Sequence, residues 1–283
     1  MSFSKITIVI TTFKSELVVE KCLESIPSEV QILIVENSNN IIFKNELEQK
    51  YKNVNCILAG DNLGYAKGNN LGISKVKTQY ALILNPDAVL ASDALDNFLQ
   101  TASHFPDFAI IGPAKQEEYS LVDLNKEKPE VFSVKSLKGF AMFLNLEQFQ
   151  EIGFFDENFF IYLEEIDLCK RLEDKNKKIY LNKKIIIHHT GGSSHNEKVN
   201  FEMELSRNWH WMWSVFYFNK KHRGYIRALF SVSKKFFTSF LKIIFYSLLF
   251  NSQKKKIYFH RLSGLFNSII GNKSWYRPKI KNN

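Results

Sequence analysis

The first candidate for catalysis or metal binding is a carboxylate that directly follows a strand-like apolar run. Asp87 comes after Leu82-Ile83-Leu84 and an Asn85-Pro86 step. Proline lacks a backbone donor and moves the preceding residue out of the helical region, so the strand must end here. In open α/β sheets, ligands bind outside the carboxyl ends of the strands. Asp87 is therefore a candidate metal ligand, although an ordinary Pro-Asp turn explains it more simply.

A second cluster is the acidic run Glu164-Glu165-Ile166-Asp167. On a helix, residues 164 and 167 share a face while 165 points elsewhere. A solvated acidic face is the plain interpretation, but five aromatic residues precede the run: Phe154, Phe155, Phe159, Phe160 and Tyr162. Partial burial beside other carboxylates would raise the pKa of a carboxyl group toward the range of a general base.

The elements that must position these residues follow an alternating pattern. Strand-like runs with helical runs between them predict βαβ units and a mostly parallel sheet. The strands are expected at 5–13, 30–36, 54–60 and 80–85, and the helices at 15–26, 43–51, 64–76 and 91–105. Beyond residue 108 the pattern loosens into strands at 108–113, 137–145 and 178–189, a polar loop at 115–135 and a helix that begins near Tyr162.

A mostly parallel sheet would bring several polar residues to one edge. Thr11 ends the first strand, Glu36 the second and Asp87 follows the fourth, so their side chains would converge on one crevice. The first strand is not followed by G-x-G-x-x-G, which argues against a dinucleotide-binding fold.

Composition describes a folded chain, 45% hydrophobic and 14% aromatic, with three scattered cysteines that lack metal spacing. An odd number of isolated cysteines favours a reducing compartment. The apolar run near the N-terminus is too short and too β-branched for a signal peptide or a membrane span, so it indicates a first strand.

Charge is divided unevenly along the chain. Residues 205–283 contain 16 Lys and Arg and no acidic residue, whereas residues 1–204 hold 22 basic residues against all 29 acidic ones. Within the basic part, the 15-residue stretch 236–250 has Lys242 in its middle and is too short to span a bilayer. Its basic flanks and abundant Phe and Tyr favour a helix that lies on an anionic membrane surface.

This basic tail has two possible partners other than a membrane. Nucleic acid also selects basic residues with interleaved aromatics, but the apolar density of 236–250 exceeds what phosphate tracking requires, so we expect no nucleic-acid partner. The other alternative is a helical hairpin that is buried against the catalytic domain or against the partner of a homodimer.

Seven motifs in order carry a resemblance to a known family: IVITTF, IVENSNN, DNLGYAKGNNLGI, LILNPDAVL, KGFAMFLN, FFDENFFIYLEEIDLCKR and IIIHHTGGSS. Over residues 5–225 the chain resembles family 2 glycosyltransferases, especially the rhamnosyltransferase-like branch. The resemblance implies a GT-A fold, which is a Rossmann-like, mostly parallel sheet flanked by helices. It also implies a nucleotide-sugar donor (dTDP-rhamnose or a UDP-sugar), inversion at the anomeric carbon and a divalent cation, Mg²⁺ or Mn²⁺.

The resemblance also assigns residues to the metal and nucleotide sites. Asn85-Pro86-Asp87 stands for the family's Asp-x-Asp element, with Asp87 as the metal ligand. The spacing H-x-x-G-x-S selects His188 as a further ligand and keeps His189 in reserve. Arg207 is a candidate for a bidentate grip on phosphate, with a helix-surface Arg as the plain alternative. The nucleotide side is assigned to Thr11, Glu36, Asn62, Gly64, Asn70, Asn85, Asp87 and Arg207.

In the catalytic cluster, the resemblance places the general base at Glu165, where the family usually has Asp. Asp167 is the alternative base, and Glu164 would orient the acceptor or cap the helix. The function implied is transfer of a sugar to a saccharide or lipid-linked acceptor in cell-surface polysaccharide synthesis. A catalytically silent relative that binds nucleotide-sugar and scaffolds a membrane assembly is the alternative.

The expected organisation is a glycosyltransferase domain over 1–225 and a tail over 226–283 that adds a basic helical appendage. The nucleotide-binding half of the domain covers 1–105 and the acceptor half covers 106–225. The protein is expected in the cytoplasm, peripheral on the inner face of the cell membrane.

Overall fold

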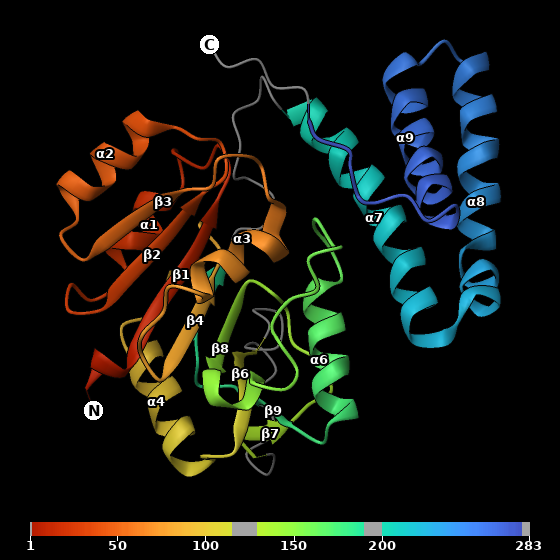
Figure 1. Cartoon of the computed structure of the whole chain (residues 1–283). Helices are drawn as coiled ribbons and strands as arrows, with labels where there is room; N and C mark the ends of the chain where they lie inside the picture. The colour runs from red at the N-terminus through yellow and green to blue at the C-terminus, as the bar shows by residue number, and fades with distance from the viewer. Residues whose placement is uncertain (1, 115–128, 190–199, 279–283) are drawn as a thin grey trace. The chain divides into compact units, whose positions relative to one another are not determined.

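A computed structural model describes residues 2–114, 129–189 and 200–278. These residues form two compact units (Figure 1). The first unit comprises residues 1–155 and 165–195, and the second comprises 156–164 and 196–283. Two segments of the sequence analysis lie outside the described residues. They are Thr190-Gly191-Gly192-Ser193-Ser194, at the end of the last motif, and most of the expected polar loop at 115–135.

The first unit is built on an eight-stranded sheet with the order β3-β2-β1-β4-β8-β6-β9-β7. Its strands are β1 (Ile6–Thr12), β2 (Gln31–Glu36), β3 (Val54–Leu58), β4 (Tyr80–Leu84), β6 (Phe108–Pro113), β7 (Val131–Ser133), β8 (Ala141–Asn145) and β9 (Lys178–Asn182). The first four strands pair in parallel, while β8 pairs antiparallel with both β4 and β6. A two-stranded sheet joins β5 (Ala88–Leu90) to β10 (Ile187–His189) in antiparallel fashion.

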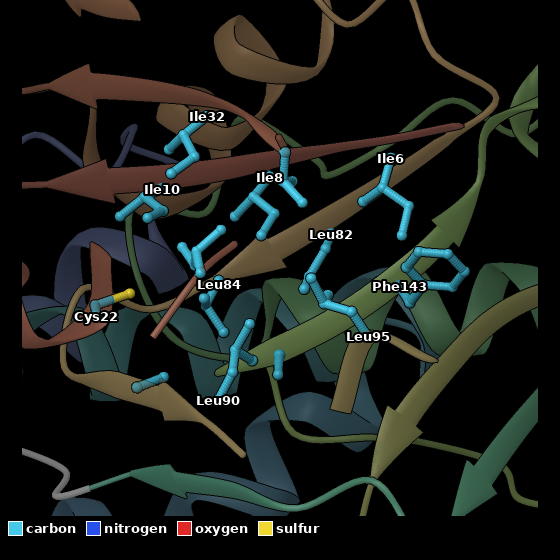
Figure 2. Packing of buried hydrophobic residues seen from close by; sticks show 14 of the residues in the cluster. Ile6, Ile8, Ile10, Cys22, Ile32, Leu82, Leu84, Leu90, Leu95 and Phe143 are labelled. Carbon is cyan, nitrogen blue, oxygen red and sulfur yellow. The ribbon is translucent and has the colours of Figure 1, made fainter. Parts of the chain in front are cut away.

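Helices cover both faces of this sheet (Figure 1). They are α1 (Val19–Glu24), α2 (Ile41–Lys50), α3 (Gly64–Ile73), α4 (Ala94–His104) and α6 (Glu164–Asp174). One core gathers the side chains of one face of the sheet with those of α1, α2 and α4, and includes Ile8 of β1, Leu82 of β4, Phe143 of β8 and Leu95 of α4 (Figure 2). Burial on both faces explains why the strands read as continuous apolar runs.

Glycines bring α3 unusually close to the other face of the sheet. A Cβ placed on Gly72 would clash with Cγ1 of Val9 and lie 3.3 Å from Cγ2 of Val35. A Cβ on Gly68 would lie 2.7 Å from Cγ2 of Thr11. These two glycines therefore serve the packing of helix on sheet, and the helix begins at Gly64, whose φ of +77° favours glycine.

The second unit consists of three helices, α7 (Asn200–Arg223), α8 (Tyr225–Leu248) and α9 (Ser252–Ile269), together with the segment 156–163. The helices α8 and α9 lie side by side as a hairpin (Figure 1). A Cβ on Gly264 of α9 would clash with the carbonyl oxygen of Trp209 on α7, so this glycine allows the two helices to cross closely.

A buried histidine fixes the chain that follows α9. His210 lies within hydrogen-bond distance of Ser274 Oγ and of the Tyr276 carbonyl, at 2.8 Å each, and its ring stacks on Phe160. Burial lowers the pKa of His210 to about 3. The histidine is therefore neutral near pH 7 and acts as a structural link within the second unit.

Comparison with the expected elements confirms the α/β fold with a mostly parallel sheet and a helical C-terminal region. The short strands β5 and β7 were not expected, and the run 178–189 is two strands with a turn at Lys183-Lys184. The expected tail boundary near 225 falls between α7 and α8, which pack together in the second unit.

We predict that Gly72→Ala destabilises the first unit, because its methyl group must displace Val9 in a packed interior. Overpacking of this kind costs about 1–3 kcal/mol, which corresponds to a melting temperature lower by several °C. Lys67→Ala, at an exposed position of the same helix, should leave the melting temperature within about 1 °C. Equal melting temperatures for the two variants would contradict the close packing of α3 on β1.

Candidate active site

The first group of site residues lies where the segment after β4 meets the end of β10. Asp87, which is buried, follows β4, and His189 ends β10, whose pairing with β5 sets His189 opposite Ala88. Nε2 of His189 lies 3.1 Å from Oδ1 of Asp87 and 3.3 Å from Nδ2 of Asn85. We call Asn85, Asp87 and His189 the acidic corner.

The donors of the acidic corner suit a divalent cation. Octahedral Mg²⁺ or Mn²⁺ binds ligands at about 2.1 Å, so two neighbouring ligands lie about 3.0 Å apart, close to the Asp87–His189 separation. The amide oxygen of Asn85 is buried and has no hydrogen-bond partner among the described residues. Among those residues no group of three His, Cys, Asp or Glu side chains converges, so substrate and water would supply the remaining ligands.

The two candidate histidines differ in their distance from Asp87. His188 is exposed, whereas His189 is half-buried beside Asp87. Successive side chains of a strand point to opposite sides, so only one of the pair can face the acidic corner. The spacing to the following glycine and serine selected His188, and the side chain at the corner is His189.

The thiol next to the acidic corner is inert. Cys22 is buried, and its Sγ donates to the carbonyl oxygen of Asn85 at 3.7 Å. Burial, and secondarily the charge of Asp87, raises the pKa of Cys22 to about 12. Without a bound metal, a thiolate nucleophile is therefore not available here near neutral pH.

The dipeptide Gly139-Phe140 connects the acidic corner to the acidic cluster. The carbonyl of Phe140 accepts from the backbone N–H of Asn85 at 2.9 Å, and its ring stacks on His189 with centroids 4.8 Å apart. The hydroxyl of Tyr65 on α3 donates to the carbonyl of Gly139. These contacts fix the dipeptide between the end of β4 and α3.

Glu165 lies against the same dipeptide. A Cβ built on Gly139 would be 3.4 Å from Cβ and 3.7 Å from Cδ of Glu165, so the glutamate side chain covers the open side of this glycine. Glu165 is half-buried. The candidate base and the acidic corner are thus held by two adjacent residues, one of which contacts Glu165 and the other His189.

Asp167, the alternative base, has a structural setting. Its side chain is fully buried, and its Oδ2 accepts from Nε of Arg171 at 2.8 Å. The guanidinium of Arg171 also donates to the carbonyls of Ile152, Gly153 and Phe154. Asp167 therefore positions an arginine that ties α6 to the preceding loop, which favours Glu165 as the base.

The backbone is strained immediately before the acidic cluster. Tyr162 and Leu163 have φ values of 73° and 67°, in the left-handed region that costs an L-residue about 1–2 kcal/mol. Edge-to-face packing of Tyr162 on Trp211 holds this turn. Glu164 is buried and is the first residue of α6, which agrees with a role at the helix start.

The polar residues after β1 and β2 form the predicted nucleotide side of the edge. Thr11 Oγ1 donates to Oδ1 of Asn69 at 2.9 Å, and Asn37 Nδ2 donates to the carbonyl of Gly64 at 3.2 Å. The buried atoms Asn37 Oδ1 and Asn69 Nδ2 have no hydrogen-bond partner in the part of the chain that the structure describes. Buried polar atoms without a hydrogen-bond partner need explanation, and a bound polar ligand supplies one.

Three residues predicted on the nucleotide side have local contacts in the structure. Both carboxylate oxygens of Glu36 accept hydrogen bonds in the turn after β2, from Ser38 and from the backbone N–H of Asn40. Asn62 Oδ1 accepts from the N–H of Gly64 at 3.2 Å. Asn70 brackets the backbone of Phe155 with two hydrogen bonds. Their nucleotide contacts stay predictions.

The last predicted residue, Arg207, lies on α7 in the second unit and is half-buried. Burial raises the pKa of Tyr162 while the charge of Arg207 opposes the rise, so this guanidinium is near the strained turn. Its phosphate contact is untested.

Sequence reasoning missed four residues that the structure brings to the site: Tyr65, Asn69, Gly139 and Phe140. A signal for the first pair was present, because Tyr65 and Asn69 are spaced by four on the helix α3 and so share a face. The role of Gly139 and Phe140 could not be predicted, because it depends on the antiparallel pairing of β8 with β4, which the sequence does not show.

Comparison with known proteins shows what the chain is similar to. The family model described as glycosyl transferase family 2 matches residues 7–169, more than half of the chain. The low-salt glycan biosynthesis hexosyltransferase Agl10 of Haloferax volcanii is 26% identical over 62% of this chain and 63% of its own length. The N-acetylglucosaminyl-diphospho-decaprenol L-rhamnosyltransferase of Mycobacterium tuberculosis is 22% identical over 58% of this chain and 68% of its own length.

Among solved structures, the mannosyltransferase PcManGT from Pyrobaculum calidifontis, in complex with GDP-Man and Mn²⁺, superposes with a TM-score of 0.59 at 10% identity. The superposition covers 94% of this chain and 87% of the mannosyltransferase. At that identity the likeness concerns the fold, which agrees with the predicted GT-A architecture.

We predict that His189→Ala weakens Mn²⁺-dependent binding of a nucleoside diphosphate, because it removes one of the two candidate protein ligands at the acidic corner. Loss of a ligand should raise the Kd at least tenfold, as measured by calorimetry with UDP and dTDP. Asp87→Asn should abolish the Mn²⁺-dependent component altogether. His188→Ala is the matched control and should bind like the wild type; a larger loss in His188→Ala than in His189→Ala would show that the corner is assigned wrongly.

Proposed function

Because the chain belongs to glycosyl transferase family 2, we propose that it transfers a sugar from a nucleoside-diphosphate donor to an acceptor hydroxyl with inversion. The observation that carries this proposal is the Gly139-Phe140 dipeptide, which contacts Glu165 through one residue and His189 through the next. Adjacent residues of the backbone thus contact the candidate base and the acidic corner. Such an arrangement suits a single displacement at the anomeric carbon, in which the base and the leaving diphosphate act together.

In this mechanism the carboxylate of Glu165 removes the proton of the acceptor hydroxyl. The acceptor oxygen then attacks the anomeric carbon, and the bond from that carbon to the diphosphate breaks on the opposite side. Asp87 and His189 would hold a divalent cation, which neutralises the charge that develops on the leaving diphosphate. Gly139 packs against Glu165, where an added Cβ would stand in van der Waals contact with the glutamate side chain.

The donor and acceptor are proposed by similarity. The Mycobacterium relative is named for transfer of rhamnose to a decaprenol-linked acceptor and the Haloferax relative for hexosyl transfer in glycan biosynthesis. We therefore propose a dTDP- or UDP-sugar donor, rhamnose being one candidate, and a lipid-linked saccharide acceptor of a cell-surface polysaccharide. The three cysteines are unpaired and buried, which suits the cytoplasmic face of the membrane.

One face of α8 supports a position at the membrane. Its exposed apolar residues recur every three or four positions and so form a single stripe. They include Ile226, Phe230, Phe236, Phe237, Phe240, Leu241, Ile244, Phe245 and Leu248. The opposite face, which includes Ala228, Val232 and Ser239, is buried within the second unit.

None of the described helices is long and apolar enough to span a bilayer. A stripe of this kind beside basic residues, in a segment that has no acidic residue after position 204, fits the interface of an anionic leaflet. We propose that α8 lies in that interface.

We predict that Glu165→Gln lowers turnover by roughly 10²–10⁴, the usual contribution of a positioned general base, with donor affinity nearly unchanged. Asp167→Asn should instead lower the melting temperature, because it removes the charge that pairs with Arg171. Steady-state kinetics and thermal melting of both variants measure these effects. A folded Asp167→Asn variant that is inactive, beside a nearly active Glu165→Gln variant, would move the base to Asp167.

The same assays separate an enzyme from a silent relative. Donor hydrolysis with a panel of dTDP- and UDP-sugars should show turnover that needs Glu165. Binding of nucleoside diphosphate without turnover of any donor would favour a scaffold that only binds nucleotide-sugar.

For the membrane, the triple variant Phe230→Ser/Phe237→Ser/Leu241→Ser should keep the wild-type melting temperature, since these side chains are exposed, and lose the salt-resistant part of liposome binding. Point variants are preferable to truncation after residue 225, because α7 packs on α8 and α9. Sedimentation with anionic and neutral liposomes measures the effect. Equal wild-type binding to both liposomes, or none to either, would indicate that α8 contacts a protein instead.

A further inference from the structure

Five side chains gather at the seam of the α8–α9 hairpin. Lys242 and Tyr246 lie one turn apart on α8, and Lys254, Tyr258 and Arg261 lie on one face of α9. The two tyrosine rings stack with centroids 5.6 Å apart and an interplanar angle of 12°. We call these five residues the seam cluster.

Each cation of the seam cluster contacts a tyrosine ring. Nζ of Lys242 is 4.9 Å from the centroid of Tyr258 and donates a hydrogen bond of 2.9 Å to its hydroxyl. The guanidinium carbon of Arg261 is 5.7 Å from the same centroid, and Nζ of Lys254 is 5.3 Å from the centroid of Tyr246. Attraction to the rings holds three positive charges on two stacked tyrosines.

The seam cluster lacks counter-charge. Neither α8 nor α9 contains an acidic residue, and no ion pair joins Lys242, Lys254 or Arg261 to a carboxylate among the described residues. Nε of Arg261 is buried and has no acceptor within that part of the chain. A buried donor of a charged group that lacks a partner is costly, so this arrangement needs a compensating anion.

Phosphate oxygens fit this requirement. A guanidinium and an ammonium form charge-assisted hydrogen bonds to a phosphate, and the guanidinium can do so in bidentate fashion. The hydroxyl of Tyr258 accepts from Lys242 and keeps its own proton to donate. Lys242, Tyr258 and Arg261 thus present donors of three kinds at one place.

The end of the hairpin places this site at a membrane. Leu249 and Phe250, which follow α8, are 57% and 94% exposed. Tyr246 lies in the last turn of α8 and Lys254 in the first turn of α9, on either side of this tip. An apolar tip that enters the acyl region would therefore bring the seam cluster to the depth of the lipid phosphates.

We propose that the seam cluster binds the phosphate group of a membrane lipid through Lys242, Tyr258 and Arg261. The site deepens the proposed membrane association and rests on it for its ligand. It lies outside the residues assigned to sugar transfer, so donor hydrolysis reports on the proposed reaction independently of the result here.

The test uses the full-length protein and the double variant Lys242→Gln/Arg261→Gln. The control is Lys255→Gln/Lys256→Gln, which removes the same charge from exposed positions of α9. Binding is measured by sedimentation with neutral phosphatidylcholine vesicles, with vesicles that contain phosphatidylglycerol, and with neutral vesicles that carry a small fraction of a polyprenyl diphosphate. Inorganic diphosphate is the soluble competitor.

We expect the double variant to bind the phosphate-bearing vesicles at least tenfold more weakly than the control does, since each lost charge-assisted hydrogen bond contributes roughly a factor of ten. Its melting temperature without ligand should not fall, because like-charge repulsion and a buried orphan donor are removed. Tyr258→Phe should weaken binding to the phosphate-bearing vesicles, because it removes the hydroxyl donor while it keeps the aromatic ring. Preference for phosphatidylglycerol identifies a bulk lipid, and preference for the polyprenyl diphosphate identifies a lipid-linked one.

Equal losses in the double variant and the control would show that only net charge matters and would overturn the site. Two results together would show that the ligand is a soluble phosphate and not a lipid. Inorganic diphosphate would raise the melting temperature of the wild-type protein without vesicles, and it would also release the protein completely from the vesicles.

Discussion

The antiparallel pairing of β8 with β4 is the constraint on which the candidate active site depends. Its register sets Ala141 opposite Leu84, and the ladder continues one step further when the N–H of Asn85 donates to the carbonyl of Phe140. Proline at position 86 then ends the strand, so Asp87 turns away directly beyond that last bond. The residues that contact His189 and Glu165 are thereby positioned by backbone hydrogen bonds, which are far less adaptable than side-chain contacts.

Close packing on the other side of the sheet supports the same edge. Gly68 and Gly72 let α3 approach β1, and this approach places Tyr65 and Asn69 of the helix over the carboxyl ends of the strands. Gly68 and Gly72 therefore act through the packing of helix on sheet. The nucleotide edge is then shaped by the amides of Asn37 and Asn69, both of which are buried and incompletely hydrogen-bonded.

Much of the fold was predictable because buried parallel strands leave a strong local signal, as Leu82-Ile83-Leu84 shows. The approximate positions of α1 to α4 also followed from apolar spacing. Prediction failed where the answer depended on pairing. In the run 178–189 a polar Asn182-Lys183-Lys184 step separates the strand-like residues, and interpretation of the run as one strand missed the turn there. The strand that begins after that turn decides which of two adjacent histidines faces Asp87. Similarly, Asp167 and Glu165 are both acids on one helix, and only the location of Arg171 and Gly139 in space separates a structural ion pair from a candidate base.

The division of charge along the chain follows from these separate settings. The first unit carries Asp87 beyond the carboxyl end of β4, where it would need a cation before an anionic donor could bind beside it without repulsion. The second unit has no acid after Glu204, and its hairpin stacks Tyr246 on Tyr258 to hold cations that have no carboxylate partner among the described residues. An exposed pair of opposite charges would contribute little stability, so the absence of acidic residues from α8 and α9 lowers the stability of the fold very little. It keeps their full positive potential for an anionic surface, at which each basic residue contributes about 1 kcal/mol.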